Sequence, residues 1–78
     1  MKRNIHVDSE FMQAHGISQE QIERMVDTAT AKFSQEAINP LLIDFCVEQT
    51  VIRVAVQKMN DHLEVVVIPS PEKSLVGG

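Results

Sequence analysis

The chain has 78 residues, with eleven acidic and seven basic side chains and a net charge of −4. This length allows one domain with a small core, so we expect a further source of stability such as oligomerisation. The acidic balance argues against nucleic-acid binding, in which lysine and arginine neutralise phosphates. A single cysteine, Cys46, excludes an intrachain disulfide and indicates a reducing, cytoplasmic compartment. Polar residues follow the charged start and predict no signal peptide, and no apolar run predicts a membrane span.

The first predicted elements are short. Residues 4–7 alternate, with Ile5 and Val7 on one face, and favour a short strand. Residues 9–15 favour one or two turns of helix, which Gly16 ends in the role of a C-cap.

A long helix is predicted from Ser18. Ser18 and Gln21 have the spacing of a capping box, in which each side chain satisfies a backbone N–H of the other residue. Asn39-Pro40 ends the helix, because proline cannot continue the hydrogen-bond ladder. Apolar residues recur between these limits at helical spacing and predict an amphipathic helix of about five turns. Its apolar face consists of Ile22, Met25, Val26, Ala29 and Phe33.

Three β-type runs between residues 41 and 68 predict an antiparallel meander. A two-residue turn at Glu48-Gln49 places Asp44 opposite Arg53, and a turn at Asn60-Asp61 places Ala55 opposite Val66. A tight two-residue turn needs positive φ, which Asn60 and Asp61 tolerate, so we expect it there. Glu48-Gln49 contains neither glycine nor asparagine, so the sequence also allows a wider connection at that point. In this register one face of every run is apolar: Leu41, Ile43, Phe45 and Val47; Ile52, Val54 and Val56; Leu63, Val65 and Val67.

The predicted fold is therefore α+β, with one long amphipathic helix packed on a three-stranded antiparallel β-meander and a short N-terminal strand or helical turn. Residues 1–69 form a single α+β domain, and residues 70–78 form a flexible C-terminal tail.

The second face of the sheet is mixed, where a domain with one helix on its sheet would have a polar face. We expect this face to be covered by the N-terminal segment, by a second copy of the chain or by another protein. In the first case the covering residues are Ile5, Val7, Phe11 and Met12. The candidate partner-binding residues are Leu42, Asp44, Glu48, Arg53, Ala55, Glu64, Val66 and Ile68.

Side chains suited to catalysis are few. His6 and Asp8 share a face of a strand and are the nearest approach to a metal-ligand pair, but the spacing of a structural metal site is lacking. Cys46 lies between two carboxylates that disfavour a thiolate, so we expect it to be a small apolar filler. His62 flanks a turn and is expected to be solvated. We therefore predict no enzymatic activity, no metal and no cofactor.

These features predict a small, acidic, cytoplasmic protein-binding module. Inhibitors, antitoxins, adaptors and mobile-element accessory proteins are of this kind, and the small core predicts a homodimer through the second sheet face. Neither nucleic acid nor a membrane is an expected partner. An interaction with a basic surface would use the acidic residues of the sheet, Asp44, Glu48 and Glu64, or those of the helix, Glu20, Glu23 and Asp27.

The end of the chain provides an alternative. Leu75-Val76-Gly77-Gly78, after the valine-rich run 63–68 and Pro69, resembles the exit of ubiquitin-like sulfur carriers such as the small subunit of molybdopterin synthase and the thiazole sulfur carrier. The resemblance implies a β-grasp fold and activation of Gly78 as an adenylate and then a thiocarboxylate. Glycine suits such a tail, because a backbone without side chains can thread an enzyme channel.

A second resemblance begins at residues 14–18, Ala-His-Gly-Ile-Ser, which precede the long helix and the three strands. This order is similar to small toxins of the RelE-like ribonuclease group, in which an N-terminal helical pair packs on an antiparallel sheet. The resemblance implies RNA cleavage by basic residues on the sheet. Arg53 is the basic residue on this sheet, so the chain would be a degenerate protein of that fold.

Overall fold

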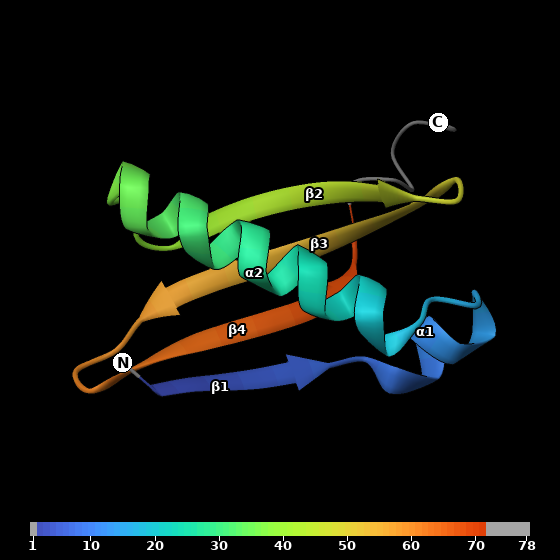
Figure 1. Ribbon diagram of the computed structural model, residues 1–78, viewed down its shortest axis with the longest axis horizontal. Coiled ribbons are helices and arrows are strands. Elements are labelled where there is room, and N and C mark those ends of the chain that lie inside the picture. Colours follow the sequence, from blue (N-terminus) through green and yellow to red (C-terminus); the bar gives the residue numbers. More distant parts are fainter. Residues whose placement is uncertain (1, 72–78) are drawn as a thin grey trace.

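A computed structural model describes residues 2–71 of the chain, which form two helices and a four-stranded sheet (Figure 1). The strand order across the sheet is β1-β4-β3-β2, with β1 parallel to β4 and the other neighbours antiparallel. The elements in chain order are β1 Lys2–Val7, α1 Ser9–Ala14, α2 Gln19–Glu36, β2 Leu41–Val47, β3 Thr50–Lys58 and β4 His62–Pro69.

The predicted α+β class is confirmed, as are the single long helix and the antiparallel pairing of the last three strands. The sheet has one strand more than predicted, because the N-terminal strand joins it. β1 pairs in parallel with β4, so that Ile5 lies opposite Val65 and Val7 opposite Val67. These pairs put the apolar residues of β1 on the same side of the sheet as the core face of β4, where α2 packs.

The predicted capping box starts α2. The Gln21 backbone N–H donates to Ser18 Oγ at 3.2 Å, and the Ser18 backbone N–H donates to Gln21 Oε1 at 2.9 Å. The helix ends at Glu36, and Ala37 follows with a left-handed φ of 56°. The buried side of α2 consists of Ile22, Met25, Val26 and Ala29, as the spacing predicts.

The core lies between α2 and one face of the sheet. Its largest fully buried side chains are Met12, Ile52, Val54, Val56, Val65 and Val67. Met12 is 1% exposed and belongs to this cluster, with Phe11 and Val7 packed against it. The expectation that Ile5, Val7, Phe11 and Met12 cover the second face is therefore wrong. The pairing of β1 with β4 directs Ile5 and Val7 to the helix side, and α1, which contains Phe11 and Met12, closes one end of the core.

Both predicted strand registers are confirmed, including Asp44 opposite Arg53 and Ala55 opposite Val66. Both turns lie at the predicted residues, but their φ angles differ from the expectation. Glu48 and Gln49 form the two-residue turn and both have positive φ, 48° and 69°, whereas Asn60 and Asp61 have none. The apolar pairs along β2 and β3 fix a two-residue loop, and that loop imposes positive φ on residues that do not prefer it.

The β-grasp arrangement that the sulfur-carrier resemblance implies is not formed. A β-grasp has a hairpin before its helix, but residues 9–14 form the helix α1 in that place. Ser70 packs beside β3, where its backbone N–H donates to the Val51 carbonyl at 3.0 Å. Most of the predicted tail, including Gly77 and Gly78, lies outside the described residues.

Candidate functional site: the open face of the sheet

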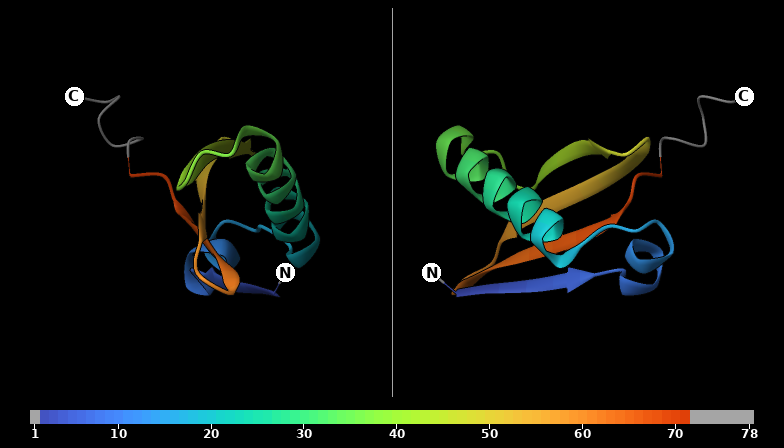
Figure 2. Two further views of the ribbon diagram at one scale, coloured as in Figure 1. Left: turned by 90° about the vertical axis from the view of Figure 1, so that its left-hand side faces the viewer. Right: turned by 45° about the vertical axis from the view of Figure 1, so that its right-hand side comes forward.

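α2 lies along one side of the sheet, and no other described segment packs over the opposite side (Figure 2). We call this opposite side the open face. It is built from the residues of each strand that alternate with the core residues. They are Asn4 and His6 of β1, His62, Glu64, Val66 and Ile68 of β4, Val51, Arg53, Ala55 and Gln57 of β3, and Leu42, Asp44 and Cys46 of β2.

An apolar strip crosses the middle of the open face. The strand registers align Val66, Ala55 and Leu42 in one row over β4, β3 and β2, and His6 of β1 ends this row. Val66 and Ala55 are half-buried, whereas Leu42 at the sheet edge is 54% exposed. Ile68 lies beside Val66 in the next row and widens the strip. Water-exposed apolar side chains in a contiguous patch with a polar border are typical of protein interfaces.

A bidentate ion pair borders the strip on the β2 side. Arg53 Nε donates to Asp44 Oδ1 at 2.9 Å, and Arg53 Nη2 donates to Asp44 Oδ2 at 3.3 Å. The hydrogen bond from Arg53 holds the pKa of the Asp44 carboxyl below its usual value. The Arg53 side chain is only 15% exposed, so its guanidinium is held in place before any partner arrives.

A second polar group borders the strip where β1 meets β4. Glu64 accepts a hydrogen bond from Asn4 Nδ2 at 3.1 Å and lies 2.8 Å from His6 Nε2 and 2.6 Å from His62 Nε2. The bonds from Asn4, His6 and His62 lower the pKa of Glu64 to about 2. Glu64 is therefore a fixed carboxylate that joins the two strands on the open face.

His62 contacts carboxylates with both ring nitrogens. Its Nδ1 lies 2.7 Å from Asp61 Oδ1 and its Nε2 lies 2.6 Å from Glu64, and its side chain is 23% exposed. Asp61 and then Glu64 raise the pKa of His62, because both stabilise the imidazolium. The expectation that His62 is solvated is wrong. Sequence reasoning missed this cluster, although Asn4 and His6 alternate along β1 as residues on one face of a strand do.

The other predicted site residues are distributed as follows. Glu48 lies in the β2–β3 turn and not on the open face. Cys46 is exposed on β2, so its predicted role as an apolar filler is wrong. Of the acidic residues on α2, Glu20 pairs with Arg24 at 3.1 Å and Asp27 with Arg3 at 3.3 Å. These pairs reduce the acidic charge that α2 offers to a basic partner.

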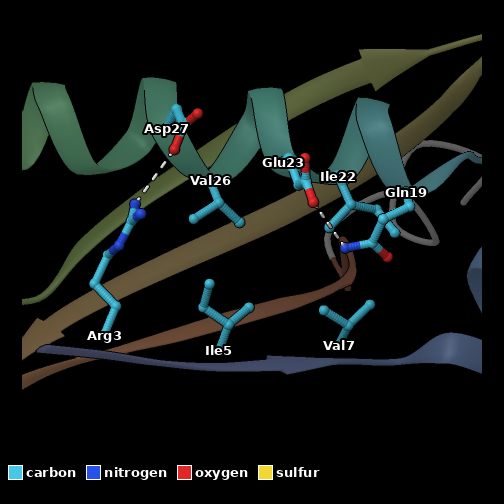
Figure 3. A pocket seen from close by; sticks show the side chains of 8 residues that line it. All are labelled: Arg3, Ile5, Val7, Gln19, Ile22, Glu23, Val26 and Asp27. Atoms are coloured by element: carbon cyan, nitrogen blue, oxygen red, sulfur yellow. Dashed lines mark hydrogen bonds and ion pairs between the residues drawn. The ribbon is translucent and has the colours of Figure 1, made fainter.

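A groove lies on the helix side, between β1 and α2 (Figure 3). Its volume is about 290 Å³, and the Arg3–Asp27 ion pair bridges it at one end. Ile5 and Val7 point from β1 toward Ile22 and Val26 of α2, so the walls are apolar and the rim is charged. A second groove of about 450 Å³ lies at the C-terminal end of α2, around Phe33.

Within residues 2–71, no group of three or more histidine, cysteine, aspartate or glutamate side chains has the geometry to hold a metal ion. In the same part of the chain, neither helix combines the length and the apolar character needed to cross a membrane. Comparison with known proteins finds no matching family model, no matching curated protein and no matching solved structure. An assignment of function to this chain therefore rests on the chemistry of the open face.

Proposed function

We propose that this chain is a small, acidic, non-enzymatic protein-binding module of the cytoplasm, and that the open face of its sheet is the binding surface. The observation that carries the proposal is the strip of Val66, Ala55 and Leu42, which the described helices leave uncovered. A partner that covers the strip removes apolar surface from water, which is the main favourable term in most protein association. An inhibitor, an antitoxin, an adaptor or a mobile-element accessory protein would use such a surface.

The polar border of the strip supports this proposal. Arg53 and Glu64 are each held by residues of their own chain, at 2.9 Å from Asp44 and at 3.1 Å from Asn4. Side chains that are already ordered lose little conformational entropy when a partner binds. Arginine is also enriched among the residues that dominate interface energies. The border therefore contributes orientation and specificity, while the strip contributes affinity.

The partner is another protein with a basic rim around an apolar centre. The chain has a net charge of −4, so long-range attraction favours a basic surface. The same charge repels nucleic acid and anionic lipid. Only one arginine, Arg53, lies on the open face, and its charge is already neutralised by Asp44.

The test is affinity capture with the whole chain and two matched variants. Ala55→Lys places a charge at the centre of the strip, while Thr28→Lys places the same charge on an exposed position of α2. We expect the wild type and Thr28→Lys to retain the same protein from a cell extract, and Ala55→Lys to lose it. Equal retention by both variants, each shown to be folded by circular dichroism, would contradict the proposal.

A further inference from the structure

The two edges of the sheet differ in how they are protected. β1 has Lys2, Arg3, Asn4 and His6 among its six residues, which is the polar character of an edge that resists pairing. β2 has the sequence Leu-Leu-Ile-Asp-Phe-Cys-Val, with neither lysine nor proline, and its pairing with β3 is continuous over all seven residues. Long, regular and apolar edges of this kind pair with another strand.

The backbone groups that β2 turns outward follow from the hydrogen bonds of β3. The Val51 carbonyl accepts from the Ser70 N–H, and the Met59 N–H donates to the His62 carbonyl. The backbone N–H and C=O groups of the odd-numbered residues of β3 therefore point toward β4. The backbone groups of the even-numbered residues of β3 point toward β2. In agreement with this, a two-residue turn makes Val47 and Thr50 a hydrogen-bonded pair. By alternation, the N–H and C=O groups of Leu42, Asp44 and Cys46 point away from the sheet.

The side chains of β2 are also incompletely covered on both sides. Ile43, Phe45 and Val47 are only half-buried on the helix side, and Leu42 and Cys46 are exposed on the open face. A strand placed beside β2 would therefore bury apolar surface above and below the sheet at once. Asp44 is the single polar side chain of the strand.

We propose that a second copy of this chain pairs antiparallel with β2, about a two-fold axis at Asp44, and joins the two sheets into one. In this register Leu41 lies opposite Val47 of the second copy, Leu42 opposite Cys46 and Ile43 opposite Phe45. The sequence predicts a homodimer through the second face, whereas the geometry of β2 favours the edge. Pairing through the edge leaves the open faces of both copies available to a partner. This consequence for partner binding rests on the proposed function.

Symmetry and charge favour a second copy and this register. The axis at Asp44 pairs all seven residues of both strands, while axes at Ile43 or Phe45 leave residues of each strand unpaired. The two halves of β2 match in apolar character on either side of Asp44. The two Asp44 carboxylates come opposite each other, but each is already bound by Arg53 of its own chain at 2.9 Å. Two carboxylates and two guanidinium groups leave no net charge at the axis, so the usual repulsion between like charges is offset.

The first test is sedimentation of the full chain with proline variants. The N–H of Leu42 points outward, so Leu42→Pro blocks pairing without removing a hydrogen bond to β3. Ile5→Pro is the matched control, because the Asp8 N–H donates to Val67 and the N–H of Ile5 therefore also points outward, on β1. We expect a dimer for the wild type and Ile5→Pro at about 50 µM, and a dissociation constant raised at least about tenfold by Leu42→Pro. Cys46→Lys leaves the backbone unchanged and should give the same loss.

The second test concerns the register. Leu42 and Cys46 are about 14 Å apart along one strand, which is too far for a disulfide within a chain. In the proposed dimer they lie opposite each other, so Leu42→Cys should form a covalent dimer under mild oxidation through the native Cys46. The double variant Leu42→Cys/Cys46→Ser should not. Absence of the covalent dimer in the single variant, or equal amounts in both variants, would overturn this register.

The outcomes separate this inference from the proposed function. A wild type that is monomeric at that concentration, or a folded Leu42→Pro variant that remains dimeric, overturns edge pairing. Ala55 lies on β3 and not at the edge, so if Ala55→Lys dissolves the dimer, the copies associate through their open faces and edge pairing is wrong, whatever the result for Leu42→Pro. The proposed function is tested by the contrast between Ala55→Lys and Thr28→Lys in capture of a protein other than the chain itself. That contrast does not depend on edge pairing, because neither residue lies on β2.

Discussion

Val65 and Val66 are neighbours on β4 that face opposite sides of the sheet. Val65 is fully buried against α2, and Val66 is half-buried on the open face. If the open face serves binding and the helix side serves folding, the same substitution must have different effects at the two positions. Val65→Ala and Val66→Ala test this directly.

The magnitude follows from burial. Each substitution removes two methyl groups, and a buried group of this size contributes about 0.8 kcal/mol, so Val65→Ala loses about 1.6 kcal/mol of transfer free energy. The cavity left in the core raises the loss in unfolding free energy to about 2 kcal/mol. In a domain of this size, that loss lowers Tm by roughly 8–16 °C. Val66→Ala loses less than about 1 kcal/mol, because water already reaches its side chain.

The assay is urea denaturation followed by circular dichroism, with thermal unfolding as a second measurement at the same protein concentration. Val66→Ala should also weaken capture of the partner, whereas Val65→Ala should not weaken it while the protein remains folded. Equal losses of stability at the two positions would show that something already covers the open face in the isolated chain, and would refute the division between the two faces.

Three further predictions concern the turn, the pH dependence and the end of the chain. Gln49 has a φ of 69°, so Gln49→Gly should be more stable in urea than Gln49→Ala by about 1 kcal/mol, and equal stabilities would contradict the left-handed turn. Glu64 has its pKa lowered from 4.5 to about 2, so its stabilising contribution is complete above pH 4.5 and is lost as the pH falls toward 2. His62 has its pKa raised above 6.5, so its contribution is complete below pH 6.5 and is lost as the pH rises through the folded-state pKa. Stability should therefore be greatest between about pH 4.5 and 6.5. In thermal unfolding, His62→Gln should flatten the alkaline side and should also weaken the dependence on the acid side, because His62 is one of the groups that lower the pKa of Glu64. Deletion of Gly77-Gly78 should leave partner capture unchanged, whereas a thiocarboxylate detected by intact mass after incubation with cell extract and ATP would favour the sulfur-carrier alternative.

Local signals in the sequence predict much of this fold. The capping box of Ser18 and Gln21 starts α2 as expected, because it depends only on residues three positions apart. The alternation along β2 and β3 fixes their register, since a shift by one residue would turn every core side chain outward. The Asp44–Arg53 pair follows from that register and was therefore predictable.

The features that the sequence did not reveal depend on contacts between residues that are far apart in the chain. β1 and β4 are about sixty residues apart in the chain and are not joined by a hairpin turn. No local signal in the sequence therefore links Asn4 and His6 to Glu64. The polar border of the open face on that side was missed for this reason. The positive φ at Glu48 and Gln49 has a related origin, because tertiary pairing of the flanking strands outweighs the preference of the turn residues.

The most direct test of the binding surface is the footprint of the captured partner on the chain, measured by methyl NMR. Binding should shift the methyl signals of Ala55, Val66 and Ile68, and should leave Ala31, which is exposed on α2, unchanged. Shifts confined to α2, with the signals of the open face unaltered, would contradict the proposal that the partner binds to the open face.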